Sequence, residues 1–396
     1  MKKIIITTVL LIQIFNVFSQ KTILNQDSVI SISLRNYPAI KASDLEIEKQ
    51  KTLKISAYDF GTTSIYTGKE EVGQNAQAGI FNKIAIEQND INIFGIIAKT
   101  NTLKVLQEQA TIKQNITEKM LIRDVKKAYY TAVAYRKKMF LLKHLDSLFA
   151  GFEKASKLKY ETNESSKIEY LTASAKYKQL KIAVKTVQNN YLSALQILNK
   201  YLSVNFIFDV DTTFPLVSNE NFSDSNLQNS KLKNYYETEV LLAEKKWKQE
   251  KSTLLPKLNA SYKVQSIDNK SGFYAWQIGV SAPLLFFSQS GKNKSARLDY
   301  EISKLNYQTK MINMKTEVNN LQQKLDILKQ ILDYYKTEAL PLADEQIKAN
   351  YLAYKLGNVD YIEFTENVES AIKTKSDFID KQLEFFINAS ELEFYN

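Results

Sequence analysis

Carboxylates at regular spacing near the end of the chain are the residues best suited to chemistry. They recur at every third position, at Asp360, Glu363, Glu366 and Glu369. On an α-helix each step of three turns the side chain back by about 60°, so the first three lie on one broad face. Carboxylates that ring a constriction favour cations, but acids at the start of a helix also complement its dipole. Both interpretations stay open from the spacing alone.

The residues that an enzyme needs do not come together in the sequence. There is no cysteine, and the single histidine, His144, lies in a helical pattern with no second histidine. The phosphate-binding patterns G-x-x-x-x-G-K and G-x-G-x-x-G and the nucleophile pattern G-x-S-x-G do not occur. The five methionines are too few and scattered to form a metal relay. We therefore predict a protein that is not an enzyme, with no catalytic residue, no cofactor and no metal of its own.

The basic excess of the chain is spread rather than clustered. The 53 lysines and arginines face 43 aspartates and glutamates, for a formal charge of +10. Lysines alternate with glutamates at helical spacings, as at Glu46, Glu48, Lys49 and Lys51, which is typical of a solvated helix face. Arginine is scarce, so nucleic-acid binding is not expected. The apolar content of 44% excludes a disordered chain.

Glycine marks the places where helices are interrupted. The chain has only 10 glycines, where average usage would give roughly 28. Eight of them fall in two windows, from Gly61 to Gly95 and from Gly272 to Gly291. Long helices are therefore the default, with irregular or extended structure concentrated twice.

The first residues have the pattern of a secretory signal peptide. Lys2 and Lys3 precede an apolar run from Ile4 to Phe18, and Ser19 provides a small residue at a possible cleavage site. The run is shorter than the roughly 20 residues of a membrane-spanning helix. Residues 1–19 are therefore predicted to be a signal peptide that is removed on export.

The rest of the chain repeats one order of elements twice. The first repeat, 20–202, contains a helix, a hairpin at about 60–94, a long helix, a tip at about 160–167 and a helix. After a linker at 203–230, the second repeat, 231–396, has a hairpin at about 257–285 and a tip at about 355–359. The tips align without gaps at an offset of 194, which pairs Tyr160, Asn163 and Glu164 with Tyr354, Gly357 and Asn358. This similarity argues for duplication.

The first long helix carries an apolar stripe with strict 4-3-4-3 spacing. Its members are Leu121, Val125, Ala128, Ala132, Tyr135, Met139 and Leu142. This spacing is that of a coiled-coil seam. An ordinary bundle helix remains the alternative.

The second hairpin alternates apolar and polar side chains. We predict that its apolar face contacts lipid, through Tyr262, Val264, Tyr274, Trp276, Ile278 and Val280. Each strand is close to the roughly 9–11 residues that cross a bilayer at a tilt. A half-buried hairpin on a soluble core is the alternative. Four strands cannot close a barrel in lipid, whereas three copies of the chain supply twelve strands.

The order of these elements resembles the TolC-like outer-membrane efflux family. The resemblance rests on the signal peptide, the doubled helix and hairpin order, the two tips, and two short motifs. These motifs are Leu255-Pro256-Lys257-Leu258, which leads into a strand, and Pro283-Leu284-Leu285-Phe286, which leaves one before Gly291. The second tip, with Tyr354, Gly357, Asp360, Tyr361 and Ile362, is similar to the heavy-metal and cation efflux branch.

The resemblance implies a mainly α fold with a small transmembrane β part. It implies a homotrimer with a twelve-stranded barrel in the outer-membrane lipid and a barrel of helices in the periplasm. Such ducts are passive exits that dock with a periplasmic adaptor protein and an inner-membrane pump, here of the resistance-nodulation-division type. A soluble periplasmic coiled-coil scaffold and the duct of a type I protein secretion system are the alternatives.

The resemblance also assigns roles to residues of the two tips. The entrance acids of the family fall nearest Glu363 and Glu366, with Glu169 as the counterpart of Glu363 in the first repeat, and Asp360 is a further gate candidate. Adaptor contacts are expected at Tyr160, Asn163, Glu164, Tyr354, Gly357 and Asn358. The first repeat departs from the pattern, since Asn163 stands where the second tip has Gly357, and Ile91 where the second hairpin has Pro283.

Overall fold

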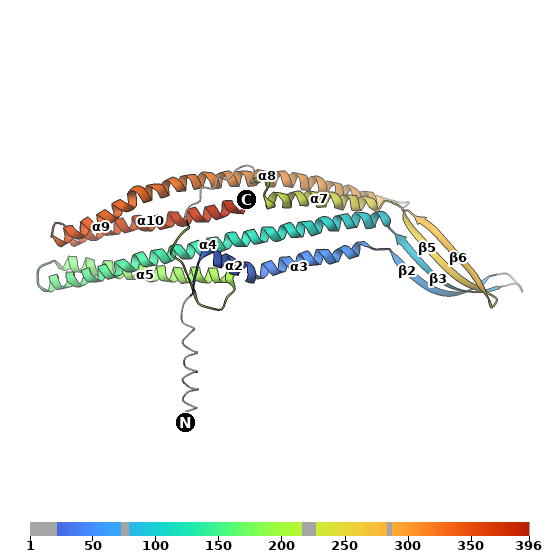
Figure 1. Cartoon of the computed structure of the whole chain (residues 1–396), viewed down its shortest axis with the longest axis horizontal. Coiled ribbons are helices and arrows are strands. Elements are labelled where there is room, and N and C mark those ends of the chain that lie inside the picture. Colours follow the sequence, from blue (N-terminus) through green and yellow to red (C-terminus); the bar gives the residue numbers. More distant parts are fainter. Residues whose placement is uncertain (1–21, 73–78, 216–226, 283–286, 396) are drawn as a thin grey trace, which may run out of the picture. The chain divides into compact units, whose positions relative to one another are not determined.

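The computed structural model describes residues 22–72, 79–215, 227–282 and 287–395. The predicted signal peptide lies outside these residues, as do part of the predicted linker (216–226) and the Pro283-Leu284-Leu285-Phe286 motif. Within them the chain is mostly helical with a small sheet, which confirms the predicted class (Figure 1). The elements divide into two compact units.

Unit 2 comprises residues 41–117 and 227–316 and contains the main sheet. Its strands are β2 (Thr62–Val72), β3 (Gly79–Ile91), β5 (Lys257–Ile267) and β6 (Lys270–Ser281). They lie side by side in the order β2-β3-β5-β6, and every neighbouring pair is antiparallel (Figure 1). Each strand joins a helix of the chain, namely α3 (Pro38–Leu53, then a 3-10 turn at Lys54–Ala57), α4 (Ile93–Glu161), α7 (Lys231–Ser252) and α8 (Phe287–Tyr334).

The turn between β5 and β6 is tight. Ile267 pairs with Lys270 across only two residues. Asp268 and Asn269 both have positive φ, 48° and 64°, as in the turns that match the twist of a hairpin. The amide of Ile80 donates to the Asp268 carboxylate at 2.9 Å, which ties the second hairpin to the first.

The first hairpin ends sooner than predicted. We expected its second strand to reach Phe94, but β3 ends at Ile91 and α4 begins at Ile93. Asn92 explains the difference, because its side-chain oxygen accepts from the Gly95 amide at 2.7 Å and its carbonyl accepts from Ile96 at 2.9 Å. A capped helix start of this kind releases the chain from the sheet.

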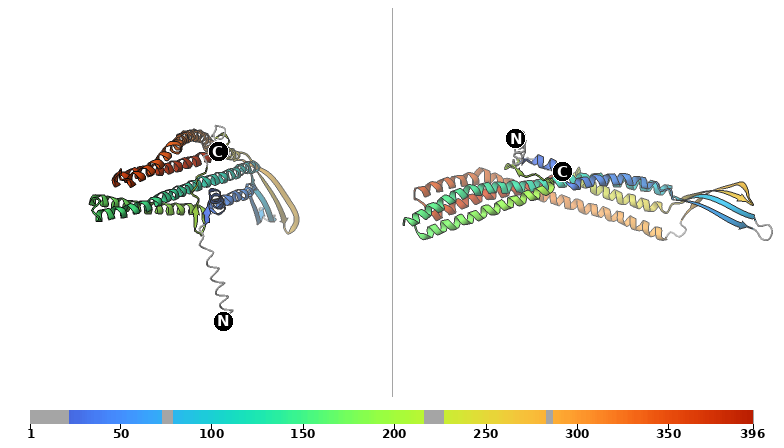
Figure 2. Two further views of the ribbon diagram at one scale, coloured as in Figure 1. Left: turned by 60° about the vertical axis from the view of Figure 1, so that its left-hand side comes forward. Right: turned by 90° about the horizontal axis from the view of Figure 1, so that it is seen from below.

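Unit 1 is a group of helices from three stretches of the chain, up to Ile40, 118–226 and from Glu317. It contains α2 (Gln26–Asn36), α5 (Lys167–Leu202), α9 (Leu340–Lys355) and α10 (Tyr361–Phe394), with the adjoining parts of α4 and α8. Helices α4 and α5 form one antiparallel pair, and α9 and α10 form another (Figure 2). Two three-residue strands, β1 (Thr22–Leu24) and β4 (Phe208–Val210), pair in parallel.

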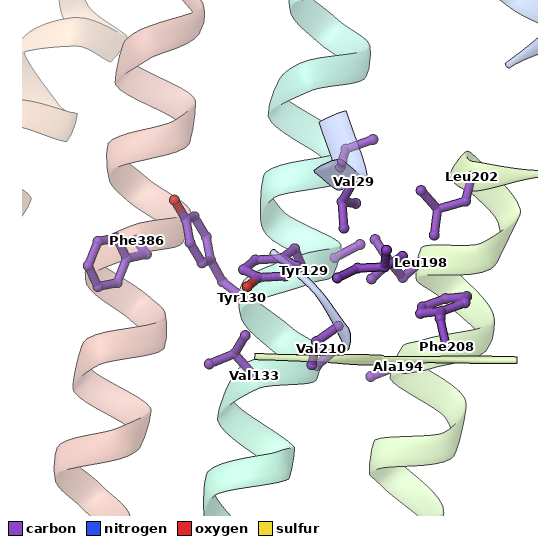
Figure 3. Packing of buried hydrophobic residues seen from close by; sticks show 14 of the residues in the cluster. Val29, Tyr129, Tyr130, Val133, Ala194, Leu198, Leu202, Phe208, Val210 and Phe386 are labelled. Atoms are coloured by element: carbon purple, nitrogen blue, oxygen red, sulfur yellow. The ribbon is translucent and has the colours of Figure 1, made fainter. Parts of the chain in front are cut away.

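The core of unit 1 gathers around the apolar stripe predicted on the first long helix. Leu121, Val125, Ala128 and Ala132 of α4 are buried. Figure 3 shows their neighbours Tyr129 and Val133 beside Leu198 of α5 and Val210 of β4. At the start of α2, the Asn25 side chain caps the helix by accepting from the Ser28 amide at 2.9 Å.

The second long helix passes through a π-helical turn before α9. This turn spans Tyr335–Ala339 and ends two residues before Pro341. Proline lacks an amide and clashes with the preceding turn, so a widened turn accommodates it without ending the helix. None of the helices in the described ranges has an apolar stretch long enough to span a bilayer.

Candidate functional site

The two tips of unit 1 have the same backbone hydrogen bonds at an offset of 194. In the first tip, Asn163 donates to Tyr160 at 3.1 Å and Glu164 donates to Lys159 at 2.7 Å. In the second, Gly357 donates to Tyr354 at 3.1 Å and Asn358 donates to Ala353 at 2.9 Å. Positive φ is shared as well, 62° at Asn163 and 77° at Gly357. Asparagine tolerates this left-handed conformation, so its substitution for glycine leaves the tip geometry unchanged.

Each tip ends in a capped helix start. The Ser166 hydroxyl accepts from the Glu169 amide at 3.2 Å, and the Asp360 carboxylate accepts from the Glu363 amide at 2.8 Å. These caps again differ by 194 positions. Asp360 therefore has a local role as the N-cap of α10, where its charge also complements the helix dipole.

The acids of the predicted gate have different surroundings. Glu363 and Glu366 are exposed and form no ion pair with any residue that the structure describes. By contrast, Glu369 pairs with Lys176 of α5 at 2.7 Å. Glu169 is half-buried beside the second tip: burial raises the pKa of the Tyr354 hydroxyl, and the Glu169 carboxylate adds a smaller increase. The predicted acids thus lie on α5 and α10 near the two tips, and Glu363 and Glu366 are exposed there.

An aromatic cluster that the sequence analysis missed supports the second tip. Phe364 and Tyr361 of α10 are completely buried. The Phe364 ring lies 4.6 Å from that of Phe152 on α4 and 5.0 Å from that of Tyr354 on α9. Most of the predicted adaptor-contact residues, by contrast, are exposed, namely Tyr160, Asn163, Glu164, Gly357 and Asn358. Tyr354 is the exception because its ring belongs to this cluster.

The sheet of unit 2 has an apolar face that is open to its surroundings. The six side chains predicted to contact lipid are between 46% and 73% exposed: Tyr262, Val264, Tyr274, Trp276, Ile278 and Val280. The face continues onto the first hairpin through Ile65 and Ile86, which the sequence analysis did not identify. Ile65, Ile86, Tyr262 and Trp276 form one continuous row across the four strands. The next row of side chains toward the helices contains polar as well as apolar residues, because Thr63 donates a hydrogen bond to Gln88 there.

The opposite face of the sheet is polar. Tyr66 donates to Glu87 at 2.6 Å, and Lys263 pairs with Glu87 at 3.8 Å. Within the described ranges, the outer strands β2 and β6 each pair with one neighbour only. The sheet thus has an apolar face, a polar face and two edges without a partner strand among the described residues.

The described residues contain no other obvious reaction centre. No three side chains among their His, Asp and Glu residues gather into a group able to hold a metal ion. His144 is exposed on α4. The geometry therefore offers acidic tips and a two-faced sheet rather than a pocket for chemistry.

Comparison with known proteins identifies the fold. No family model matches the chain, and no curated protein matches it. A crystal structure of CusC, from a study of transmembrane channel formation, matches with a TM-score of 0.80 at 12% identity over 96% of this chain and 95% of that one. The CmeC outer-membrane channel of Campylobacter jejuni matches with a TM-score of 0.79 at 11% identity, over 93% and 85% of the two chains. The open MtrE outer-membrane channel of Neisseria gonorrhoeae gives 0.77 at 13% identity, over 93% and 88%.

Because the sequence identities are only 11–13%, these comparisons establish the fold alone. The chain has the fold of these outer-membrane channels over nearly its whole length. The resemblance predicted from the motifs is confirmed at that level.

Proposed function

We propose that this chain is a TolC-like outer-membrane protein, the passive exit duct of a tripartite efflux system. The observation that carries the proposal is the sheet of unit 2. It exposes an apolar row across all four strands, yet the outer edges of β2 and β6 have no partner strand among the described residues. In lipid an unpaired edge is costly, because no water satisfies its backbone groups. The fold shared with solved outer-membrane channels supports the same function.

The proposed assembly is a homotrimer. Its strand directions alternate from β2 to β6, so β6 of one copy and β2 of the next would also be antiparallel. Three copies give twelve strands, an even number within the range of such barrels. The helical parts would extend into the periplasm, where the tips would meet a periplasmic adaptor and, through it, an inner-membrane pump of the resistance-nodulation-division type.

Fractionation and conductance test this proposal. We expect the full chain in the outer-membrane fraction, as a detergent-resistant trimer that forms single channels in a planar bilayer. Recovery only from the soluble periplasm would instead support the scaffold function. A membrane-bound protein without conductance would contradict the duct.

We place the entrance of the duct at the tips, with Glu363, Glu366 and Glu169 as its acidic lining. Asp360 lies on the same face and also caps α10. In a trimer each acid recurs three times, which concentrates negative charge around the passage and favours cations.

Neutralising two of these acids is expected to weaken cation preference. The double variant Glu363→Gln with Glu366→Gln should lower the cation-to-anion permeability ratio about fivefold, corresponding to a loss of about 1 kcal/mol of attraction per cation. Reversal potentials in a salt gradient measure this ratio. The matched control is Glu338→Gln with Glu345→Gln, which removes two exposed acids from a neighbouring stretch. Equal ratios in the two double variants would reject the acidic entrance.

A further inference from the structure

A groove with an apolar floor and a basic rim lies where the helices of unit 2 meet the sheet. It has a volume of about 290 Å³ between the start of α4 and the end of α7. Its lining includes Phe94, Ile97, Leu255, Lys245, Lys248 and Lys251. We call this the basal groove. It is separate from the tips and from the polar face of the sheet.

The charge of the basal groove is one-sided. None of the described residues that line it is acidic. Lys245 and Lys251 form no ion pair with any described residue, and Lys248 pairs only with Glu244 on its own helix. Two of the apolar side chains are more than half exposed, 52% at Phe94 and 56% at Ile97. The groove thus offers exposed apolar surface beside three lysine ammonium groups, of which only that of Lys248 has an acidic partner among the described residues.

The basal groove opens on the same side as the apolar face of the sheet. A second, polar hollow lies at the same junction, and its lining includes Thr62, Lys257 and Lys99. Thr62 and Lys257 belong to the polar face by strand alternation, since they share parity with Ser64 and Ser261. Lys99 also lies on the face of α4 opposite to Phe94 and Ile97 at 100° per residue. The polar hollow and the basal groove therefore lie on opposite faces of α4, although both are lined by Ser252 of α7.

We propose that the basal groove binds an anionic phospholipid of the leaflet in which the base of the sheet lies. The lysines would hold the phosphate, and Phe94, Ile97 and Leu255 would contact the first part of an acyl chain. Lysine suits such a position because its aliphatic stem packs on apolar surface while its ammonium reaches the headgroup layer. This inference rests on the proposed function, which places the sheet in a membrane.

A second copy of the chain fits the groove less well than lipid. The groove belongs to α4 and α7, which join the inner strands β3 and β5. Another copy would join at the outer strands, where the open backbone groups are. The groove is also continuous with the apolar face through Leu258, which follows Leu255 by three residues and pairs with Ile91.

Lipid retention by the purified full-length assembly tests the proposal. Native mass spectrometry compares phosphatidylglycerol with phosphatidylcholine, each added to the protein in detergent micelles. We expect phosphatidylglycerol to be retained at least about tenfold more strongly by the wild type. Each neutralised lysine should weaken that retention about fivefold. The triple variant Lys245→Gln, Lys248→Gln and Lys251→Gln should therefore lose the preference.

The matched control removes the same charge elsewhere in unit 2. Lys104→Gln, Lys113→Gln and Lys315→Gln replace exposed lysines outside the groove, and this variant should keep the preference. Loss of preference in both triple variants would overturn the site, as would displacement of lipid by millimolar inorganic phosphate. Conductance separates the two proposals: a wild type that conducts without lipid preference overturns only the groove, whereas a wild type that never inserts overturns the duct.

Discussion

Ile65→Lys is expected to prevent most of the protein from reaching its membrane-inserted trimer. Ile65 is 73% exposed and begins the apolar row that crosses all four strands to Trp276. A lysine on the lipid face of a barrel costs about 2–4 kcal/mol near the middle of the bilayer. The trimer carries this cost three times. The measurement is the fraction of protein recovered as trimer from the membrane, compared with the wild type.

The preceding residue provides the control. Ser64 lies on the polar face of the same strand, where its partner across the first hairpin is Glu87. Ser64→Lys adds the same side chain one position away and should leave trimer recovery within about twofold of the wild type, because water and an acidic neighbour accommodate the charge. If both variants insert equally well, the apolar face does not contact lipid. If both fail, the effect is on folding and not on the choice of face.

The face of the sheet on which each side chain lies could be predicted from the sequence, because alternation along a strand is a local property. Side chains alternate across a sheet with a period of two, so Tyr262 and Val264 define the face of their strand wherever it packs. All six predicted side chains are exposed for this reason. Ile65 and Ile86 follow the same alternation, and attention to it in the first hairpin would have identified them.

Contacts between distant segments could not be read in this way. Phe152 and Phe364 meet in the second tip although 212 residues separate them. The helical pattern around each residue predicts that its side chain is buried, but it does not predict which distant residue the side chain contacts. The pairing of β1 with β4 involves only three residues on each side, too few for a periodic signal. The cap at Asn92 is an intermediate case, since an asparagine before a helical run is a recognisable start signal.

For the acids of the proposed gate, the spacing predicts a shared helix face, whereas the structure shows which of the carboxylates have partners. A period of three placed Asp360, Glu363 and Glu366 on one face, but it did not distinguish a cap from a free carboxylate. The hydrogen bond from the Glu363 amide assigns the cap to Asp360. Glu369 is separated from the others by its pairing with Lys176. Of the four regularly spaced acids, only Glu363 and Glu366 therefore have neither a capping role nor an ion pair among the described residues.

Phe364→Ala is expected to loosen the second tip more than any exposed substitution in it. The ring is fully buried and packs against Phe152 and Tyr354. Truncating a buried phenylalanine to alanine costs about 3–5 kcal/mol. The cluster around it, with Leu145 and Val368, is separate from the larger core around Val133 and Leu198. The loss should therefore appear as local opening of the tip.

Hydrogen exchange measures this opening residue by residue. Amides around Phe364 and Val368 should lose about a hundredfold or more of their protection, since 3 kcal/mol corresponds to more than a hundredfold change in an equilibrium constant. Amides around Leu198 should keep theirs. Ile362→Ala is the control, because Ile362 is 38% exposed and its truncation is expected to cost less than about 1 kcal/mol. Unchanged protection at Val368 would mean that the tip is held by its backbone hydrogen bonds rather than by this aromatic cluster. If the cluster does hold the tip, the variant should also conduct more in planar bilayers, because a loosened entrance closes less completely.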